Sequence, residues 1–257
     1  MMNKHTTSIS QNLLNDLQTI SLDELDKVKL LDRKDTKFVF NQIQLPSILE
    51  KIKPYYRILE INNSPIFNYD NTYFDTDDFL FYYQHHNEHR QRFKVRFRKY
   101  SSSSKSFFEI KIKNNKNRTV KKRLLVNEMN KYLGKQEENL VSEIIGLKPT
   151  QLAPILDIQF SRITLTDNNF SERLTIDTNL SVKNGTSIKI FDQLAISEIK
   201  QKKYNPKSDI VQILRNMKIP EMRFSKYCMG MLHVNKDIKY NRFKPKLLQI
   251  NNNLSLE

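Results

Sequence analysis

The sequence predicts an α+β fold in which antiparallel β-strands form a sheet with helices packed on its outside. Three observations support this prediction. Short runs with two-residue alternation recur through the chain, and such alternation sends side chains to opposite faces of a strand. The polar positions of these runs are mainly basic in one run after another. Runs with helical spacing lie before, between and after them.

The expected elements follow from spacing and from turn residues. We expect strands at about 33–41, 54–61, 67–76, 91–100, 106–114, 118–127, 154–166, 171–180, 186–191 and 193–201. We expect helices over about 8–30, from Pro46 onward, and over 136–146, 206–217 and 222–235, with a short helical or irregular crossing at 77–89. Ser21 and Glu24 have the spacing of a capping box. The sequence thus predicts a single domain over 1–241, including the N-terminal helix, and a partly disordered tail over 242–257.

One face of the expected sheet is strongly basic. In the run RFKVRFRKY, Lys94, Arg96 and Arg98 alternate with apolar residues and therefore share a face. The bases assigned to this face are Arg33, Lys37, Lys94, Arg96, Arg98, Lys111, Lys113, Lys121, Arg123, Arg173 and Lys200, and the acids are Asp35, Glu109, Asp177 and Glu198. Like charges on neighbouring strands repel each other, so the face needs either solvent or a polyanion to compensate it.

The overall charge narrows the classes of partner. Lys and Arg total 43 against 28 Asp and Glu, a net charge of +15, which favours nucleic acid, an anionic membrane surface or polyphosphate. A generally lysine-rich surface would give the same total. The chain has only 4 Gly and no GxGxxG or GxxxxGK[ST] string, so neither a Rossmann nor a P-loop nucleotide site is supported.

The sequence also favours a cytoplasmic protein. Cys228 is the only cysteine, which excludes an intrachain disulfide and a cysteine-based zinc site and fits a reducing compartment. The first residues lack the apolar region of a signal peptide, and no run of 18 apolar residues is long enough for a transmembrane helix.

Two arrangements of the basic face remain open at this point. In one, the face is an exposed outer surface, as in a nucleic-acid binder. In the other, the sheet closes with the basic face inward, and a barrel of about eight strands leaves room for side chains and one small ligand.

Seven short motifs together resemble a known family. They are RKDTKF at 33–38, YFDT at 73–76, KVRFRKY at 94–100, FEIKIK at 108–113, RLTIDT at 173–178, EIK at 198–200 and RFSKY at 223–227. Their types and order are similar to those of the VTC domain, the polyphosphate polymerase domain of the vacuolar transporter chaperone family, which also has bacterial members. That family belongs to the triphosphate tunnel metalloenzyme superfamily. The resemblance covers about residues 25–235.

The resemblance implies that the strands form a closed antiparallel β-barrel of about eight strands with helices packed on the outside. The tunnel inside it is expected to bind ATP and polyphosphate with basic side chains and a divalent metal, Mn²⁺ or Mg²⁺, and to transfer the terminal phosphate of ATP onto a polyphosphate chain. It makes nucleic acid an unlikely partner. The residues expected to act in catalysis are Lys37, Arg96, Arg98, Lys111, Arg173, Lys200 and Lys226. Those expected to bind substrate are Arg33, Lys94, Lys121, Lys122, Arg162, Arg223 and Ser225. Glu198 is the expected metal ligand, with Asp35 or Glu109 as a further ligand.

Some features leave alternatives open. Hydrolases of the superfamily open with a Glu-x-Glu-x-Lys pattern, but here Arg33 takes the first acidic position, which favours transfer over hydrolysis. A triphosphatase or polyphosphatase and a non-catalytic binder of polyphosphate or nucleic acid remain alternatives. Glu198 could equally be an ion-pair partner. Strict alternation from Phe160 puts Arg162 on the apolar side, so an inward Arg162 requires a bulge.

Overall fold

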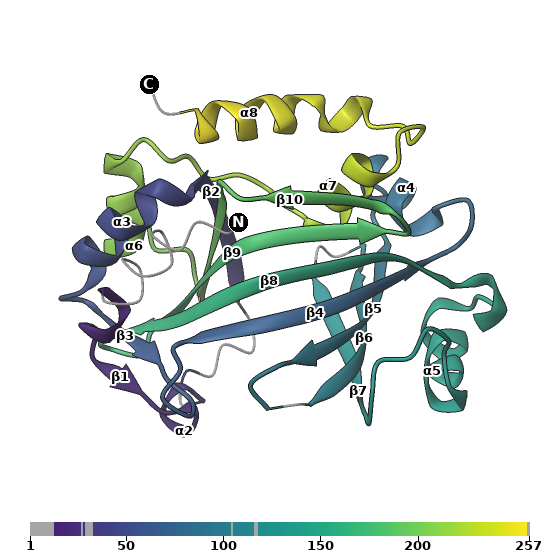
Figure 1. Cartoon of the computed structure of the whole chain (residues 1–257), viewed down its shortest axis with the longest axis horizontal. Coiled ribbons are helices and arrows are strands. Elements are labelled where there is room, and N and C mark those ends of the chain that lie inside the picture. Colours follow the sequence, from purple (N-terminus) through teal and green to yellow (C-terminus); the bar gives the residue numbers. More distant parts are fainter. Residues whose placement is uncertain (1–12, 27, 29–32, 104, 116–117, 256–257) are drawn as a thin grey trace.

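The computed structural model describes residues 13–26, 28, 33–103, 105–115 and 118–255, and its centre is one large sheet (Figure 1). The strands are β1 (Thr19–Ile20), β2 (Lys34–Asn41), β3 (Tyr56–Leu59), β4 (Ile66–Asp75), β5 (Arg92–Tyr100), β6 (Ser106–Lys113), β7 (Thr119–Val126), β8 (Ala153–Asp167), β9 (Glu172–Asn184), β10 (Ser187–Phe191) and β11 (Leu194–Gln201). The helices are α2 (Leu22–Leu25), α3 (Leu45–Ile52), α4 (Leu80–His86), α5 (Lys135–Ile145), α6 (Asp209–Asn216), α7 (Lys226–Val234) and α8 (Lys244–Leu254), with 3-10 turns η1 (Gln42–Gln44), η2 (Pro149–Gln151) and η3 (Asn241–Phe243).

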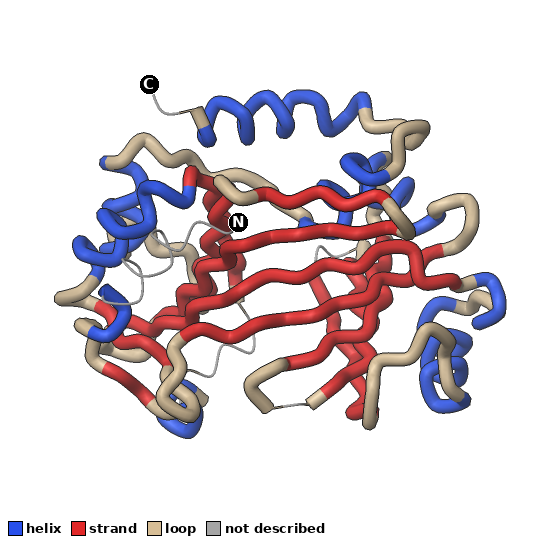
Figure 2. Tube along the Cα trace, viewed as in Figure 1, coloured by secondary structure: helices blue, strands red, loops and turns tan. Residues whose placement is uncertain are grey.

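The main path of the sheet has the order β2-β11-β9-β8-β4-β5-β6-β7. All pairings along this path are antiparallel. β10 and β3 add to β9 and β8, and the short β1 pairs with β3 in parallel. Figure 2 shows the long central strands running side by side while the strands at the two ends of the order turn away from their plane.

The sheet is not closed into a barrel, so the expected closure is wrong, although the α+β class is correct. Closure would require β2 to pair with β7, and no such pairing occurs in the described part of the chain. The segment before α7 occupies the edge of β2 instead: the Met222 amide donates to the Lys37 carbonyl over 2.9 Å, and Phe38 forms an isolated bridge with Glu221. A backbone edge already paired in this way cannot accept another strand.

The apolar side of the sheet is covered at both ends by helices. Phe38, Leu174 and Ile176 face a cluster that includes residues of α3 and α6, and Phe97 and Ile110 belong to a second cluster with Val141 of α5. In Figure 1, α3 and α6 lie together at one end of the sheet and α5 lies at the other. Most of the stabilisation at these ends therefore comes from burying one face of each strand against a helix.

Helix α7 lies on the opposite, basic side of the sheet. Its Gly230 packs so closely on β8 and β9 that an added Cβ would lie 2.8 Å from Leu156 Cδ2 and 3.1 Å from Val182 Cγ1. Tyr227, Met229 and Met231 of this helix are buried in a third apolar cluster. The helix thus closes part of the basic face and brings its own N-terminus next to the charged side chains.

Both ends of the sequence differ in part from expectation. The capping box at Ser21 is present, with the Glu24 amide donating to Ser21 Oγ over 3.3 Å. However, Thr19 and Ile20 form strand β1 inside the expected helix over 8–30, the beginning of which lies outside the described residues. In the tail expected to be partly disordered, Lys244–Leu254 form α8. None of the described helices is long and apolar enough to span a membrane.

Candidate functional site

The basic face carries three carboxylates, each held by two bases. Glu198 on β11 lies between Lys37 on β2, 3.3 Å away, and Lys200 on its own strand, 2.5 Å away. Lys37 and Glu198 are directly paired in the β2–β11 ladder, and Lys200 follows on the same face two residues later. The strand register therefore brings these groups together without help from a loop.

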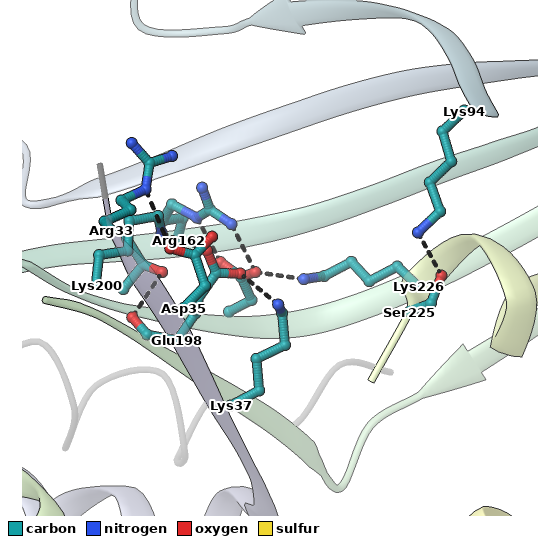
Figure 3. A network of polar contacts seen from close by, with 11 residues as sticks. Arg33, Asp35, Lys37, Lys94, Arg162, Glu198, Lys200, Ser225 and Lys226 are labelled. Carbon is teal, nitrogen blue, oxygen red and sulfur yellow. Dashed lines mark hydrogen bonds and ion pairs between the residues drawn. The ribbon is translucent and has the colours of Figure 1, made fainter. Parts of the chain in front are cut away.

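The second carboxylate joins the sheet to α7. Arg162 on β8 contacts Asp177 on β9 with two nitrogens, Nε at 2.5 Å and Nη2 at 2.8 Å. Lys226, the first residue of α7, donates to Asp177 Oδ2, the oxygen that also accepts from Arg162 Nη2. Figure 3 shows Arg162, Lys226, Lys37 and Glu198 converging on one region from different elements of the chain.

The third carboxylate lies on β6. Arg96 on β5 contacts Glu109 with Nε at 2.9 Å and Nη2 at 2.5 Å, and Lys121 on β7 reaches the other carboxylate oxygen at 3.2 Å. Arg96 also donates through Nη1 to the hydroxyl of Tyr73 on β4 at 2.8 Å. Its neighbour Arg98 donates to Asn71 Oδ1 at 2.8 Å. Both guanidinium groups are thus buried; Arg96 is fixed by a charged and a neutral partner, and Arg98 by a neutral one.

Aromatic rings support the bases at the centre of this face. Tyr69 and Phe160 are stacked with ring centroids 5.0 Å apart. The guanidinium carbons of Arg98 and Arg162 lie 5.2 Å and 5.0 Å from the Tyr69 ring, and Lys226 Nζ lies 4.5 Å from the Phe160 ring. Cations over ring faces are attracted to them and lose little freedom when they bind a ligand.

The bulge expected near Arg162 is present but for a different reason. The β8–β9 register shifts between Gln159 and Ser161, so Phe160 has no partner on β9. Phe160 itself faces the basic side, where it stacks on Tyr69, and it therefore shares a face with Arg162. The starting assumption that Phe160 marks the apolar side was wrong.

These clusters change the acidity of their members. Burial alone would raise the pKa of Glu198, but Lys200 and Lys37 hold it well below its usual range. In the same way, burial opposes ionisation of Asp177, but Arg162 and Lys226 lower its pKa to about 2. Lys111 has its pKa lowered well below the usual value, first by the neighbouring charge of Arg96 and then by burial. The carboxylates are therefore ionised across the physiological range.

The acids on this face can bind a metal only if phosphate oxygens complete its coordination shell. No group of three or more His, Cys, Asp or Glu is clustered among the residues with described positions. Glu198 offers one carboxylate, and the Asp35 carboxylate at the same end of the β2–β11 ladder pairs across from Lys200. Mg²⁺ is commonly bound by one or two carboxylates together with substrate phosphates, so the residues fit a metal that arrives with an anionic ligand.

The structure places the expected site residues in different surroundings. Those in the three carboxylate clusters are Lys37, Arg96, Lys121, Arg162, Glu198, Lys200 and Lys226, and Arg98 lies beside them. Arg173 shares their face, but its Nη2 donates to the Leu25 carbonyl at 2.9 Å and so ties the N-terminal segment to β9. Arg33 pairs with Asp35 at 3.0 Å near the start of β2.

Lys122 differs from its neighbour Lys121. In the β6–β7 ladder Lys122 is opposite Ile110, which is buried in the cluster beneath α5, whereas Lys121 is opposite Lys111. The two lysines therefore project to opposite faces of β7, and only Lys121 is directed to the charged face.

The remaining expected residues line a cavity of about 240 Å³ at the N-terminus of α7. Lys94, Lys111, Arg223 and Ser225 all contribute to its wall. Lys94 Nζ donates to Ser225 Oγ at 3.0 Å, and Ser225 Oγ also accepts the Cys228 amide as the cap of α7 (Figure 3).

The sequence analysis missed several neutral residues of the site. Asn71 and Tyr73 fix Arg98 and Arg96, and their alternation within β4 was the signal that could have revealed them. Asp75 is fully buried, accepts the amides of Phe81 and Tyr82 at 2.8 Å and 2.9 Å, and bonds the Tyr227 hydroxyl. It thereby joins α4 to α7, and no pattern in the sequence indicates that role.

The comparisons with known proteins agree with this geometry. The family model of the VTC domain matches residues 32–235, which is most of the chain. The chain belongs to the VTC domain family. No curated protein matches the sequence.

Two solved structures illustrate the fold shared with this VTC domain. HpAC1 from Hippeastrum, which is assigned as an adenylyl cyclase and described as having a dominant triphosphatase activity, is 12% identical with a TM-score of 0.51, covering 80% of this chain and 99% of its own. A protein of Bacillus halodurans assigned as an adenylate cyclase is 14% identical with a TM-score of 0.47, covering 76% of this chain and 95% of its own. At these identities the likeness concerns the fold alone.

Proposed function

We propose that this VTC domain is a metal-dependent phosphotransferase that moves the terminal phosphate of ATP onto a polyphosphate chain. The observation that carries the proposal is the convergence of buried bases from several strands and from α7 on one face, each held by a carboxylate or by a neutral acceptor. Buried cations prepared in this way suit a ligand with many negative charges.

The paired carboxylates occupy positions that phosphate oxygens could take. Arg162 contacts both oxygens of Asp177 in the bidentate arrangement that guanidinium groups also use for phosphate. Lys37 and Lys200 are more mobile point charges on either side of Glu198. We infer that Arg96, Arg98 and Arg162 orient the triphosphate while Lys37, Lys200 and Lys226 neutralise it.

Phosphoryl transfer demands positioning and charge stabilisation more than covalent chemistry. Glu198 would hold a divalent metal, which would supply positive charge to stabilise the transferred group. The acceptor in the polymerase reaction is a phosphate oxygen that is already ionised, so the bases need only hold donor and acceptor in line. No residue has to remove a proton from the acceptor.

A triphosphatase is the second candidate, because the described activity of HpAC1 is that of a triphosphatase and its fold resembles this one. Hydrolysis needs a positioned water, which is usually held by acids. Here the position of the first acid in the hydrolase pattern is Arg33, and Arg33 pairs with Asp35. This pairing favours transfer over hydrolysis.

The test is product analysis after incubation of the protein with ATP and Mn²⁺. Long chains together with ADP support the phosphotransferase, whereas orthophosphate without chains supports the hydrolase. Lys200→Gln should reduce either activity at least about tenfold, since it removes a charge next to Glu198. Lys202→Gln, a change of an exposed lysine two residues later, is the matched control and should retain full activity. Absence of any turnover in the wild-type protein, with phosphate binding intact, would contradict both candidates.

A further inference from the structure

Strand β4 supplies no base to the charged side of the sheet, although it lies between β8 and β5, which both do. Its neutral residues hold the bases of a neighbouring strand instead. Asn71 Oδ1 accepts a hydrogen bond from Arg98 Nε, and the Tyr73 hydroxyl accepts one from Arg96 Nη1, each at 2.8 Å. Asp75 follows Tyr73 by two residues and therefore shares its face. The proposed reaction makes no use of this carboxylate, although it is fully buried.

The Asp75 carboxylate is held by neutral donors. Unlike the three carboxylates of the charged clusters, it forms no salt bridge with any residue that the structure describes. Its Oδ1 accepts the amides of Thr76 and Phe81, both at 2.8 Å. Its Oδ2 accepts the Tyr82 amide at 2.9 Å and the Tyr227 hydroxyl. An asparagine could not accept all four bonds, because its NH2 group is a donor. The position therefore requires a carboxylate for its capacity to accept hydrogen bonds.

Tyr227 carries this contact into helix α7. It is the second residue of the helix, directly after Lys226, which donates to Asp177. Its ring stacks on the Tyr73 ring with centroids 5.1 Å apart and an angle of 23° between the planes. Asp75 fixes the hydroxyl end of the Tyr227 ring, and Tyr73 fixes its face. The ring therefore has one orientation, and so does the helical turn that carries Lys226.

Three side-chain hydrogen bonds between described residues hold the first turn of α7 against the sheet. They are the Lys94–Ser225, Lys226–Asp177 and Tyr227–Asp75 bonds. The first two engage bases that a phosphate ligand would draw to itself. The third joins side chains of residues that are only 2% and 0% exposed, so a ligand cannot compete for it. It is thus the contact that keeps the turn in place when the charged contacts rearrange.

We propose that Asp75 and Tyr227 are positioning residues that set the place of Lys226 on the charged face. They allow Lys226 to exchange its carboxylate partner for a phosphate oxygen while the helix stays where it is. The proposal rests on the proposed function, because it takes a phosphate chain as the ligand of Lys226. Neither Asp75 nor Tyr227 touches the ligand itself.

Tyr227→Phe removes only the hydroxyl and is the variant that tests this role. Titration calorimetry of the full chain with tripolyphosphate and Mn²⁺ should show binding weakened about tenfold, the loss expected for one hydrogen bond to a carboxylate. In a Lys226→Gln protein, the same substitution should weaken binding by less than about twofold, because the side chain that the hydroxyl positions is no longer there. Effects of independent residues add, so an undiminished loss in Lys226→Gln would overturn the proposal.

Tyr82→Phe is the matched control, because it also removes one hydroxyl from a buried tyrosine. The Tyr82 hydroxyl donates to the Lys239 carbonyl at 3.0 Å, and Lys239 belongs to none of the charged clusters. This variant should lower the melting temperature as Tyr227→Phe does, but leave tripolyphosphate binding unchanged within about twofold. Equal losses of affinity in the two variants would show a general effect of stability and would overturn the positioning role.

A second measurement needs no phosphate. Acetic anhydride acylates a lysine faster when its amine is less firmly held, and mass spectrometry gives the rate for each lysine. Tyr227→Phe should raise the rate at Lys226 about threefold to tenfold, the factor that one net hydrogen bond contributes, and Tyr82→Phe should leave it unchanged. Asp75→Asn should match Tyr227→Phe, since it removes the acceptor of the same bond. An unchanged rate at Lys226 in Tyr227→Phe would also overturn the proposal.

These outcomes are separate from the fate of the proposed function. If ATP yields no chains but the loss of tripolyphosphate binding in Tyr227→Phe depends on Lys226, the polymerase proposal fails and the positioning role stands. If chains form but the two losses add, the positioning role fails and the polymerase proposal stands. If the wild type binds no tripolyphosphate, the proposed function fails, and the acylation rate at Lys226 alone decides the positioning role.

Discussion

Lys226 at the start of α7 and Arg162 on β8 share the carboxylate of Asp177, and both donate to its Oδ2. This arrangement fixes the helix N-terminus to the sheet through a charge, in addition to the apolar contacts of Tyr227. It also means that the position of Lys226, and of the adjacent Ser225, depends on a residue in the middle of β9. Loss of Asp177 should therefore affect both stability and ligand binding.

Asp177→Asn tests the stability contribution of this carboxylate through its pH dependence. The pKa of Asp177 is about 2 in the folded protein and near its ordinary value of about 3.9 when unfolded. A carboxylate with a lowered folded pKa stabilises the protein above the unfolded pKa, and this contribution of about 2 kcal/mol is lost as the pH falls towards 2. In urea unfolding, the gap between wild type and Asp177→Asn should narrow between about pH 4 and pH 2. Asp192→Asn, at an exposed position, should show no such change; a constant gap for Asp177→Asn would count against the ion cluster.

Variants of Glu109 and Tyr73 compare how much each of these two partners of Arg96 contributes to the free energy of unfolding. Glu109→Gln leaves Arg96 and Lys121 facing each other without a carboxylate, and removal of one member of a buried pair costs about 3–5 kcal/mol. Tyr73→Phe removes one neutral acceptor and should cost about 1 kcal/mol. Free energies of unfolding from denaturant titration measure both. Equal losses would show that Glu109 does not hold Arg96 as the contacts indicate.

Lys121 and Lys122 provide a matched pair on one strand. Lys121→Gln should lower turnover or phosphate affinity by about tenfold, because Lys121 reaches Glu109 on the charged face. Lys122→Gln should change either quantity by less than about twofold, since Lys122 projects to the other face. Steady-state kinetics with ATP, or calorimetry with tripolyphosphate, distinguishes them. The reverse order would mean that the register of β7 is shifted by one residue.

Glu198 should link the metal to the phosphate ligand. Without ligand, Glu198 forms ion pairs with Lys37 and Lys200, so we expect its oxygens to become accessible to a cation only when phosphate draws these lysines away. Mn²⁺ should then strengthen tripolyphosphate binding about tenfold in the wild type. By linkage, tripolyphosphate should strengthen Mn²⁺ binding by the same factor. Calorimetry with and without Mn²⁺ should show this difference lost in Glu198→Gln. A variant that keeps the full Mn²⁺ effect would place the metal elsewhere.

Alternation predicted much of the charged face because its signal is local. Lys94, Arg96 and Arg98 lie on one face as their spacing requires, and Glu109 and Lys111 lie opposite them on the next strand. The capping box at Ser21 was predictable for the same reason, since both of its members lie within four residues. Such features depend on neighbours in the sequence and need no knowledge of the whole fold.

Features that depend on distant pairing could not be predicted in this way. The edge of β2 is occupied by Met222, far along the chain, and nothing in the spacing around Lys37 indicates this. The bond between Asp75 and the Tyr227 hydroxyl is also long-range, since it joins residues 152 positions apart. The N-terminal strand at Thr19 and Ile20 is two residues long and gains its pairing from β3, so its local pattern still resembled a helix.

β2 and β7 are not paired in the described residues, and this affects how a phosphate chain could reach the basic side of the sheet. In a closed barrel, a phosphate chain would have to enter with one of its ends first. In the described residues no ladder joins these two strands, and Thr119 of β7 lies at the same cavity as Arg223, which follows the segment on the edge of β2. Separating these two strands breaks no hydrogen bond between them, so if the protein acts on polyphosphate as proposed, a chain whose ends are both remote could enter from the side.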